Sequence, residues 1–156
     1  MLSRPPAVFL NFQYPWGNVE LRPVPPPGPS SPSSSPSLAY RANYFQGSFP
    51  SSNVASDGWE FTAPVGQYGP QNAYGLYNMV GNVWEWVDDW WAGPPGAAGG
   101  GGSDEAPKSD KVKRGGSFLC HPDYCFRYRN SARSKNTPDS TASNLGFRCA
   151  ADVDEN

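Results

Sequence analysis

The stretch RGGSFLCHPDYCFRYRN, residues 114–130, places two of the chain's three cysteines and its only histidine within six consecutive positions. These residues are Cys120, His121 and Cys125. The intervening HPDY sequence favours a tight reversal, which would bring the two sulfur atoms together. Close thiols can form a structural disulfide, act as a redox or copper-binding pair, or supply two of the four ligands of zinc, which would also need His121 and Cys149. The spacing alone leaves these alternatives open.

Regular secondary structure around this stretch is expected to be short, because 18 of the 156 residues are Pro and 17 are Gly. We predict an α+β fold with little regular secondary structure. The segments KVKRGGSFL (111–119), CFRYRN (125–130) and NLGFRCAA (144–151) are predicted to form short strands. The segment NMVGNVWEWVDDWW (78–91) fits a helix or a strand equally well. Folds of this kind usually need metals or disulfides as extra fasteners.

Two low-complexity runs divide the chain, a Pro/Ser-rich run at 23–37 and a Gly-rich run at 93–107. Both have little to bury, so we interpret them as insertions between blocks that share one core. Residues 1–13 form an N-terminus without a recognisable pattern, and 153–156 form a tail. The N-terminus is not expected to act as a signal peptide, because its apolar stretch is short and no small-residue cleavage site follows.

The charge pattern argues against nucleic-acid and membrane partners. The net charge is −2, and no apolar run approaches the roughly 20 residues of a membrane span. No basic motif with interleaved aromatic residues indicates nucleic-acid binding. Nine of the twelve Lys and Arg residues nevertheless lie between Lys108 and Arg148, which predicts a local basic surface of solvated charges or a site for a polar or anionic partner.

Two further groups of residues have both a structural and a functional interpretation. Asn43 with Asp57, and Asn78 with Glu85, are oxygen-bearing residues in loops, where they form turns and caps or, as the minority alternative, bind calcium. The dense tryptophans of 84–91 indicate core packing first and a peptide- or sugar-binding wall second.

Several of these motifs together resemble the formylglycine-generating enzyme family, also called sulfatase-modifying factors. They are YPWGN (14–18), RANYFQGSFP (41–50), TAPVGQY (62–68), GLYNMVGNVWEWVDDWW (75–91), RGGSFLCHPDYCFRYR (114–129) and SARSKNTPDSTASNLGFRCAAD (131–152). The resemblance covers most of 14–152 and implies the formylglycine-generating-enzyme fold, a C-type-lectin-like variant, without its N-terminal part. The Cys-His-x-x-Tyr-Cys arrangement is similar to the catalytic cysteine pair of the active branch, which the silent paralogue lacks.

The resemblance implies a copper-dependent oxidase. The family converts a cysteine in the Cys-x-Pro-x-Arg motif of unfolded, newly made sulfatases to Cα-formylglycine with molecular oxygen, using Cu(I) as cofactor. Cys120 and Cys125 would hold the copper, with Cys125 the permanent ligand and Cys120 the more exposed partner. The other site residues implied are Ser117 and Trp84 in the oxygen and copper pocket, His121 beside it, and Asn144 in substrate binding. The alternatives are an inactive module that binds sulfatase peptides, or a calcium-stabilised binding protein with a structural disulfide.

The resemblance also implies two Ca²⁺ ions. The first would be held by Asn43, Asp57 and the carbonyls of Tyr44 and Trp59; the second by Asn78, Glu85 and the carbonyls of Gly81 and Val83. Asn130 stands where animal members have a disulfide cysteine. Cys149 matches another, whose partner lies in the part of the domain this sequence lacks, so a free thiol is expected. Eukaryotic members work in the lumen of the endoplasmic reticulum.

Overall fold

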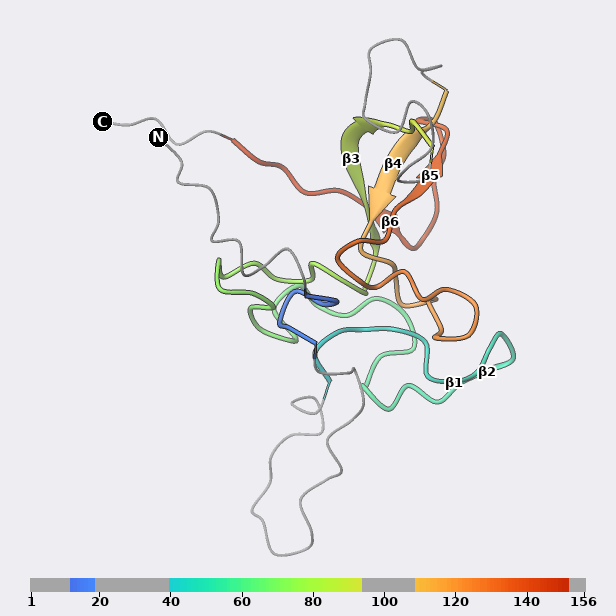
Figure 1. Cartoon of the computed structure of the whole chain (residues 1–156). Helices are drawn as coiled ribbons and strands as arrows, with labels where there is room; N and C mark the ends of the chain where they lie inside the picture. The colour runs from blue at the N-terminus through green and yellow to red at the C-terminus, as the bar shows by residue number, and fades with distance from the viewer. Residues whose placement is uncertain (1–11, 19–39, 94–108, 152–156) are drawn as a thin grey trace, which may run out of the picture.

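The computed structural model of the chain describes residues 12–18, 40–93 and 109–151 (Figure 1). Within these ranges the chain forms six short strands and no helix, which confirms the predicted scarcity of regular secondary structure. The predicted Pro/Ser-rich insertion, nearly all of the Gly-rich insertion, the first eleven residues and the predicted tail lie outside the described residues. Among the described residues, none belongs to a helix long and apolar enough to cross a membrane.

The main sheet has four strands in the order β5-β4-β3-β6. They are β3 (Trp84–Trp90), β4 (Lys111–Arg114), β5 (Ser134–Asn136) and β6 (Leu145–Gly146). The β3–β4 and β4–β5 pairs are antiparallel, whereas β6 pairs in parallel with the start of β3 (Figure 1). The sheet therefore brings the sequence-distant segments around residues 84, 114 and 145 together.

The structure decides the ambiguous segment 78–91 in favour of a strand, which begins at Trp84. The first half of 111–119 is a strand as predicted, and it ends where Gly115 and Gly116 adopt positive φ. The prediction of a strand at 125–130 was wrong, because the backbone there bonds to local turns and to the N-terminal segment. For example, Arg127 N–H donates to Cys125 O (2.6 Å) and Asn130 N–H donates to Gln13 O (2.8 Å).

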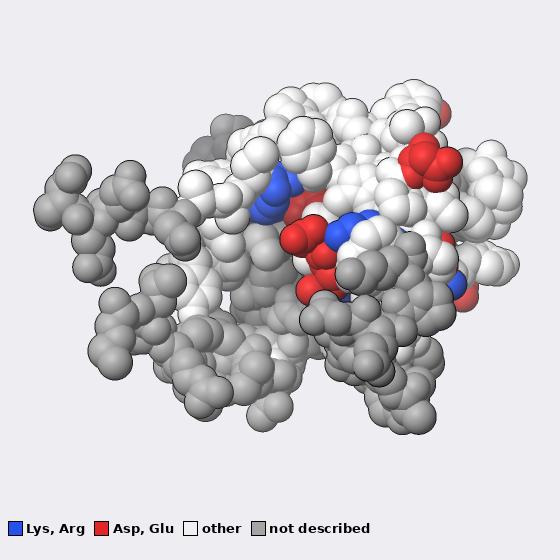
Figure 2. Space-filling view, turned by 90° about the horizontal axis from the view of Figure 1, so that it is seen from above, with Lys and Arg blue, Asp and Glu red and all other residues white. Residues whose placement is uncertain are grey.

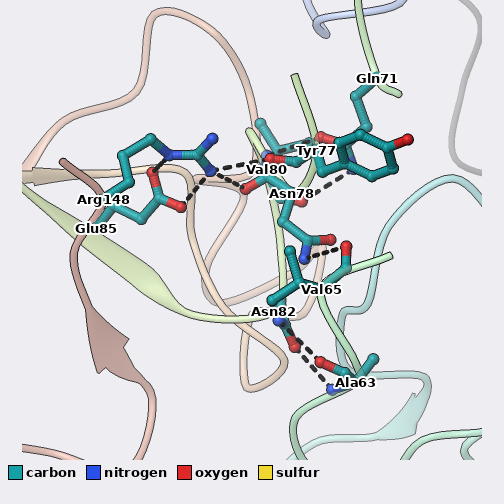
Figure 3. Close-up of polar contacts among 9 residues, drawn as sticks. All are labelled: Ala63, Val65, Gln71, Tyr77, Asn78, Val80, Asn82, Glu85 and Arg148. Atoms are coloured by element: carbon teal, nitrogen blue, oxygen red, sulfur yellow. Dashed lines mark hydrogen bonds and ion pairs between the residues drawn. The ribbon is translucent and has the colours of Figure 1, made fainter. Parts of the chain in front are cut away.

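Side-chain amides take the place of strand pairing in the loops between 54 and 83. The side chain of Asn82 donates to Ala63 O (3.2 Å) and accepts from Ala63 N–H (2.8 Å) (Figure 3). In the same way, Gln71 Oε1 accepts from Val80 N–H (3.1 Å), and Asn78 Nδ2 donates to Val65 O (3.1 Å). These amides satisfy buried backbone groups that would otherwise destabilise an irregular fold.

The core lies between the sheet and these loops. Trp84 is buried in this core. Trp86 and Trp90 of β3, and Trp91 directly after the strand, are only half-buried. The buried cluster consists of Tyr14, Tyr40, Ala42, Tyr44, Val80, Trp84, Cys120 and Tyr128. A two-stranded hairpin of β1 (Gly47–Ser48) and β2 (Ser52–Asn53) projects from the loop region (Figure 1).

Asn130 connects the N-terminal segment to the rest of the described structure. Its side-chain Nδ2 donates to Phe12 O (2.9 Å), and its backbone N–H donates to Gln13 O. Two hydrogen bonds from an asparagine therefore join these segments at the position where the family resemblance implied a disulfide cysteine.

The basic residues of the C-terminal half lie among acidic ones. Lys111 pairs with Asp88 (2.9 Å) and Lys135 pairs with Asp110 (2.6 Å). Figure 2 shows acidic and basic side chains next to each other on one face. The predicted basic surface is thus partly neutralised by these pairs.

Candidate functional site

The Cys120–Cys125 loop forms the tight reversal predicted from its sequence. The N–H groups of Tyr124 and Cys125 both donate to the carbonyl oxygen of His121, at 3.1 and 2.7 Å. The Cα atoms of the two cysteines lie 4.7 Å apart and their sulfur atoms form a disulfide. The turn therefore brings the two sulfur atoms together. They form a disulfide in this structure and would be two neighbouring thiols after reduction.

The two cysteines differ in burial in the opposite sense to the prediction. Cys120 is 1% exposed and belongs to the core cluster, whereas Cys125 is half-buried beside it. The prediction that Cys120 is the more exposed partner was wrong, because its backbone is held inside the fold. Its N–H donates to Ser117 O (2.9 Å), and its carbonyl accepts from Phe45 N–H (3.0 Å).

Ser117, Asn144 and Trp84 come together next to this cysteine. Ser117 is fully buried, and its Oγ accepts hydrogen bonds from Asn144 Nδ2 (3.0 Å) and from Leu119 N–H (3.3 Å). The carbonyl of Asn144 accepts from Trp84 N–H (2.8 Å), just where β6 begins its parallel pairing with β3. With both acceptor directions of Ser117 Oγ used, its hydroxyl proton can be donated to a third group.

His121 sits at the edge of the loop in an aromatic surrounding. Its ring contacts those of Phe45, Phe49 and Tyr124, with centroids 6.0 to 6.4 Å away. Its Nδ1 accepts a hydrogen bond from Asp123 N–H (3.2 Å). The ring is therefore oriented by the turn and by its aromatic neighbours.

The tetrahedral zinc alternative is not supported by the arrangement. Within the described residues there is no group of three or more His, Cys, Asp or Glu side chains that could hold a metal ion. Cys149 is a free, exposed thiol, as expected from the resemblance. The sulfur-based candidate site thus consists of the Cys120–Cys125 pair alone, which offers two soft ligands and, among the described residues, no third.

The first predicted calcium loop has the features of a cation site. Asn43 is fully buried, and its Oδ1 accepts no hydrogen bond within the described residues. Asp57 is 2% exposed and, in the described part of the chain, has no Lys, Arg or His partner. Its Oδ1 accepts from Trp59 N–H (3.0 Å) and its Oδ2 from Tyr68 O–H (3.3 Å).

Burial raises the pKa of Asp57, although its hydrogen bonds oppose the shift. Burial and the nearby Asp57 carboxyl also raise the pKa of Tyr68. A divalent cation would supply the positive charge that this carboxylate lacks and a partner for the unpaired oxygen of Asn43. Tyr44 follows Asn43 directly, so its carbonyl belongs to the same loop. These residues therefore supply oxygen ligands of the types that calcium takes.

The second predicted calcium loop differs, because its carboxylate already has a cationic partner. Both oxygens of Glu85 are bound by Arg148, through Nε (2.6 Å) and Nη2. Nη2 also donates to the carbonyls of Tyr77 (2.9 Å) and Asn78 (3.2 Å). These residues, as arranged here, do not fit a metal ion. Gly81 and Val83, whose carbonyls complete the prediction, lie in the same loop.

Several residues of these sites gave no signal in the sequence. Gln46, whose Oε1 accepts from Asp57 N–H (3.0 Å), lies in the loop of Asn43 and Tyr44, whereas Tyr68 lies on another loop. The Nζ of Lys113 lies 4.9 Å from the ring centre of Trp84. Burial lowers the pKa of Lys113, and the positive charge of the nearby Arg127 lowers it further. Arg148 was visible only as one of several arginines. Such long-range partners follow from the chain path and have no local pattern.

Comparisons with known proteins agree with the resemblance. The family model "Sulfatase-modifying factor enzyme 1-like domain" matches residues 7–153. The chain is 50% identical over 144 residues to a formylglycine-generating enzyme of Mus musculus, covering 91% of this chain and 34% of the relative. It is 46% identical over 145 residues to a formylglycine-generating enzyme of Thermomonospora curvata, with coverage of 90% and 43%. It is also 37% identical over 140 residues to an inactive Cα-formylglycine-generating enzyme 2 of Bos taurus, with coverage of 88% and 37%.

Among solved structures, PvdO from Pseudomonas aeruginosa matches with a TM-score of 0.51 and 33% identity, covering 69% of this chain and 38% of PvdO. The chain thus spans between a third and a half of the length of these curated relatives. The family match spans nearly the whole sequence, and the structural match covers 69% of it. The chain belongs to the sulfatase-modifying factor enzyme 1-like family.

Proposed function

We propose that this chain is the part of a formylglycine-generating oxidase that carries its cysteine pair. The observation that carries the proposal is the position of that pair. Cys120 and Cys125 lie on one tight turn, and Ser117, which precedes the turn, is bonded to Asn144 from a segment 27 residues away. A disulfide that served only as a staple would not need a buried serine hydroxyl held by a distant amide beside it.

Reduction of the disulfide would free two thiols, and their thiolates together suit Cu(I) better than harder metals. Copper(I) bound there would supply the activation of molecular oxygen. The protein contributes the remainder of the site. The buried Cys120 fixes one sulfur against the core, and Trp84 closes the core side to water. The hydroxyl of Ser117, held by Asn144, can donate a proton to a bound group at a fixed position.

The proposed substrate is an unfolded sulfatase segment with the Cys-x-Pro-x-Arg motif, whose cysteine becomes Cα-formylglycine. Exposed aromatic groups next to the cysteine loop would receive such a segment. Tyr124 is 69% exposed, and its ring lies 5.3 Å from that of Phe49. In this proposal His121 orients these rings, and the whole protein works in the lumen of the endoplasmic reticulum.

A calcium ion at the Asn43–Asp57 loop is the second part of the proposal. It would stabilise loops that lack regular secondary structure and that lead directly into the cysteine site. The link is the hydrogen bond from Phe45 N–H to Cys120 O (3.0 Å), two residues after Asn43. Calcium would thus act on the fold that holds the sulfurs and would take no part in the oxidation.

The test is a competition titration of the reduced chain with Cu(I), comparing the unmodified chain with Cys120→Ser and Cys125→Ser. Cys149→Ser is the matched control, because Cys149 is a free, exposed thiol outside the site. We expect one equivalent of copper to bind tightly, to be lost in either site variant and to be retained in the control. Conversion of a Cys-x-Pro-x-Arg peptide in oxygenated buffer then tests the reaction.

Equal copper binding in all four proteins, or none in the unmodified chain, would refute the assignment of this pair as copper ligands. Tight copper binding without any peptide conversion would instead favour a module that binds sulfatase peptides without oxidising them.

A further inference from the structure

We infer that Arg148 is the built-in cation of the loop formed by residues 77–85, and that it competes with calcium for Glu85. The inference rests on the family's calcium chemistry but not on the copper reaction. In this loop the second calcium site was predicted, but the carboxylate of Glu85 is bound by an arginine. The inference explains this difference by the side chain of Arg148.

The guanidinium of Arg148 lies against the carboxylate that the predicted calcium site in this loop would use. Figure 3 shows it between the Glu85 carboxylate on one side and the backbone of residues 77–78 on the other. It binds both carboxylate oxygens and donates to the carbonyls of Tyr77 and Asn78. Carboxylate and carbonyl oxygens are also what calcium selects. An arginine fork and a calcium ion would therefore both use the carboxylate oxygens of Glu85.

The two predicted calcium loops form a natural comparison within one chain. Asp57 is buried without a cationic partner in the described residues, and Asn43 Oδ1 is unpaired there. Glu85 is also largely buried, with 19% of its side chain exposed, but its charge is balanced by Arg148. The first loop therefore has a buried carboxyl group without a cation of its own, whereas the second loop already contains one.

Arg148 also connects distant parts of the site. Arg148 lies two residues after β6, and Asn144 directly precedes that strand. Its side chain contacts the loop that leads into Trp84 at the start of β3. A bidentate arginine fixes both distance and angle between such segments. Calcium binding at Glu85 would have to displace this fork or bind beside its positive charge, and both reduce calcium affinity.

The test is calorimetric titration of the metal-free chain with calcium, before and after Arg148→Gln. Removal of a unit charge in direct contact with the carboxylate should tighten Glu85-dependent calcium binding by about tenfold or more. The double variant with Glu85→Gln should lose this gain. Asp57→Asn identifies the heat that belongs to the first loop, which Arg148→Gln should leave unchanged.

Arg129→Gln is the matched control. Arg129 lines the same cavity of about 430 Å³ as Glu85 and Arg148, but its guanidinium lies 5.1 Å from the ring of Phe126. Its loss changes the net charge equally without freeing Glu85. If Arg148→Gln does not fold, Arg148→Lys gives the same answer at smaller amplitude, because an ammonium cannot form the two-pronged contact.

Three results would overturn the inference. They are equal calcium affinity in the unmodified chain and in Arg148→Gln, an equal gain in Arg129→Gln, and the absence of Glu85-dependent binding in every variant. None of these bears on the cysteine pair, whose copper binding is measured separately with the cysteine variants. Failure of this inference and failure of the proposed oxidase function are therefore distinguishable.

Discussion

Gly81 provides the sharpest test of how the loops are packed. Its φ is +76°, and a Cβ added there would collide with the carbonyl oxygen of Asn43 and approach Asn43 N to 3.1 Å. Gly75 has almost the same φ, +75°, but a Cβ there meets nothing within 4 Å. The two glycines therefore separate backbone strain from steric collision.

Gly75→Ala should destabilise the chain by about 1 kcal/mol, because an L-residue is strained in the left-handed region. Gly81→Ala adds the collision with rigid backbone, which costs roughly 1–3 kcal/mol. It also disturbs the hydrogen bond from Asn82 N–H to Asn43 O (2.8 Å), a further loss of about 1 kcal/mol. We expect a total loss of about 3–5 kcal/mol for Gly81→Ala.

The assay is urea unfolding of both variants, followed by tryptophan fluorescence, with the free energy of unfolding obtained by linear extrapolation. Gly81→Ala should also weaken calcium binding, because the displaced Asn43 is a proposed ligand. If the two variants lose the same stability within about 0.5 kcal/mol, the close approach of Gly81 to Asn43 is refuted.

Two further predictions concern buried polar groups. Burial raises the pKa of Asp57 above its ordinary value of 3.8, so the metal-free folded chain binds more protons than the unfolded chain. Stability should therefore fall as pH rises through that raised pKa, and Asp57→Asn should remove this slope in pH-dependent thermal unfolding without calcium. A slope that survives in Asp57→Asn would contradict the assignment. Ser117→Ala should cost about 1–2 kcal/mol in urea unfolding and reduce peptide conversion, because Asn144 Nδ2 and Leu119 N–H lose their acceptor. Ser140→Ala, which removes a half-buried hydroxyl that also accepts from an asparagine amide, is the control and should leave conversion unchanged.

The sequence was most informative where the chemistry is local. The turn between Cys120 and Cys125 follows from residues that favour reversal, so its closure could be predicted from the spacing. The strand β4, which forms the first half of 111–119, ends at Gly115 and Gly116, and these two glycines were visible in the sequence. The family motifs are likewise short contiguous stretches, so the family resemblance needs no knowledge of how the chain folds.

The segments that were predicted wrongly or left open depend on distant neighbours. The alternating pattern at 125–130 looks like a strand, but no described strand pairs with it, and its backbone bonds to a turn and to Gln13. The segment 78–91 could have been helix or strand until β4 and β6 provided hydrogen-bonding edges for β3. A strand is defined by its partner, so a single segment cannot settle the question.

The sequence by itself determined the family, the reactive residue types and the tight cysteine turn, because these depend on residues close together in the chain. Only the tertiary structure decided which side chains share a site. It buried Cys120 rather than Cys125, joined Asn144 to Ser117, left Asn43 Oδ1 without a partner in the described residues, and gave Glu85 an arginine 63 residues away. The physical reason is that burial and charge pairing arise where distant segments meet, and those meetings are set by packing of the whole chain.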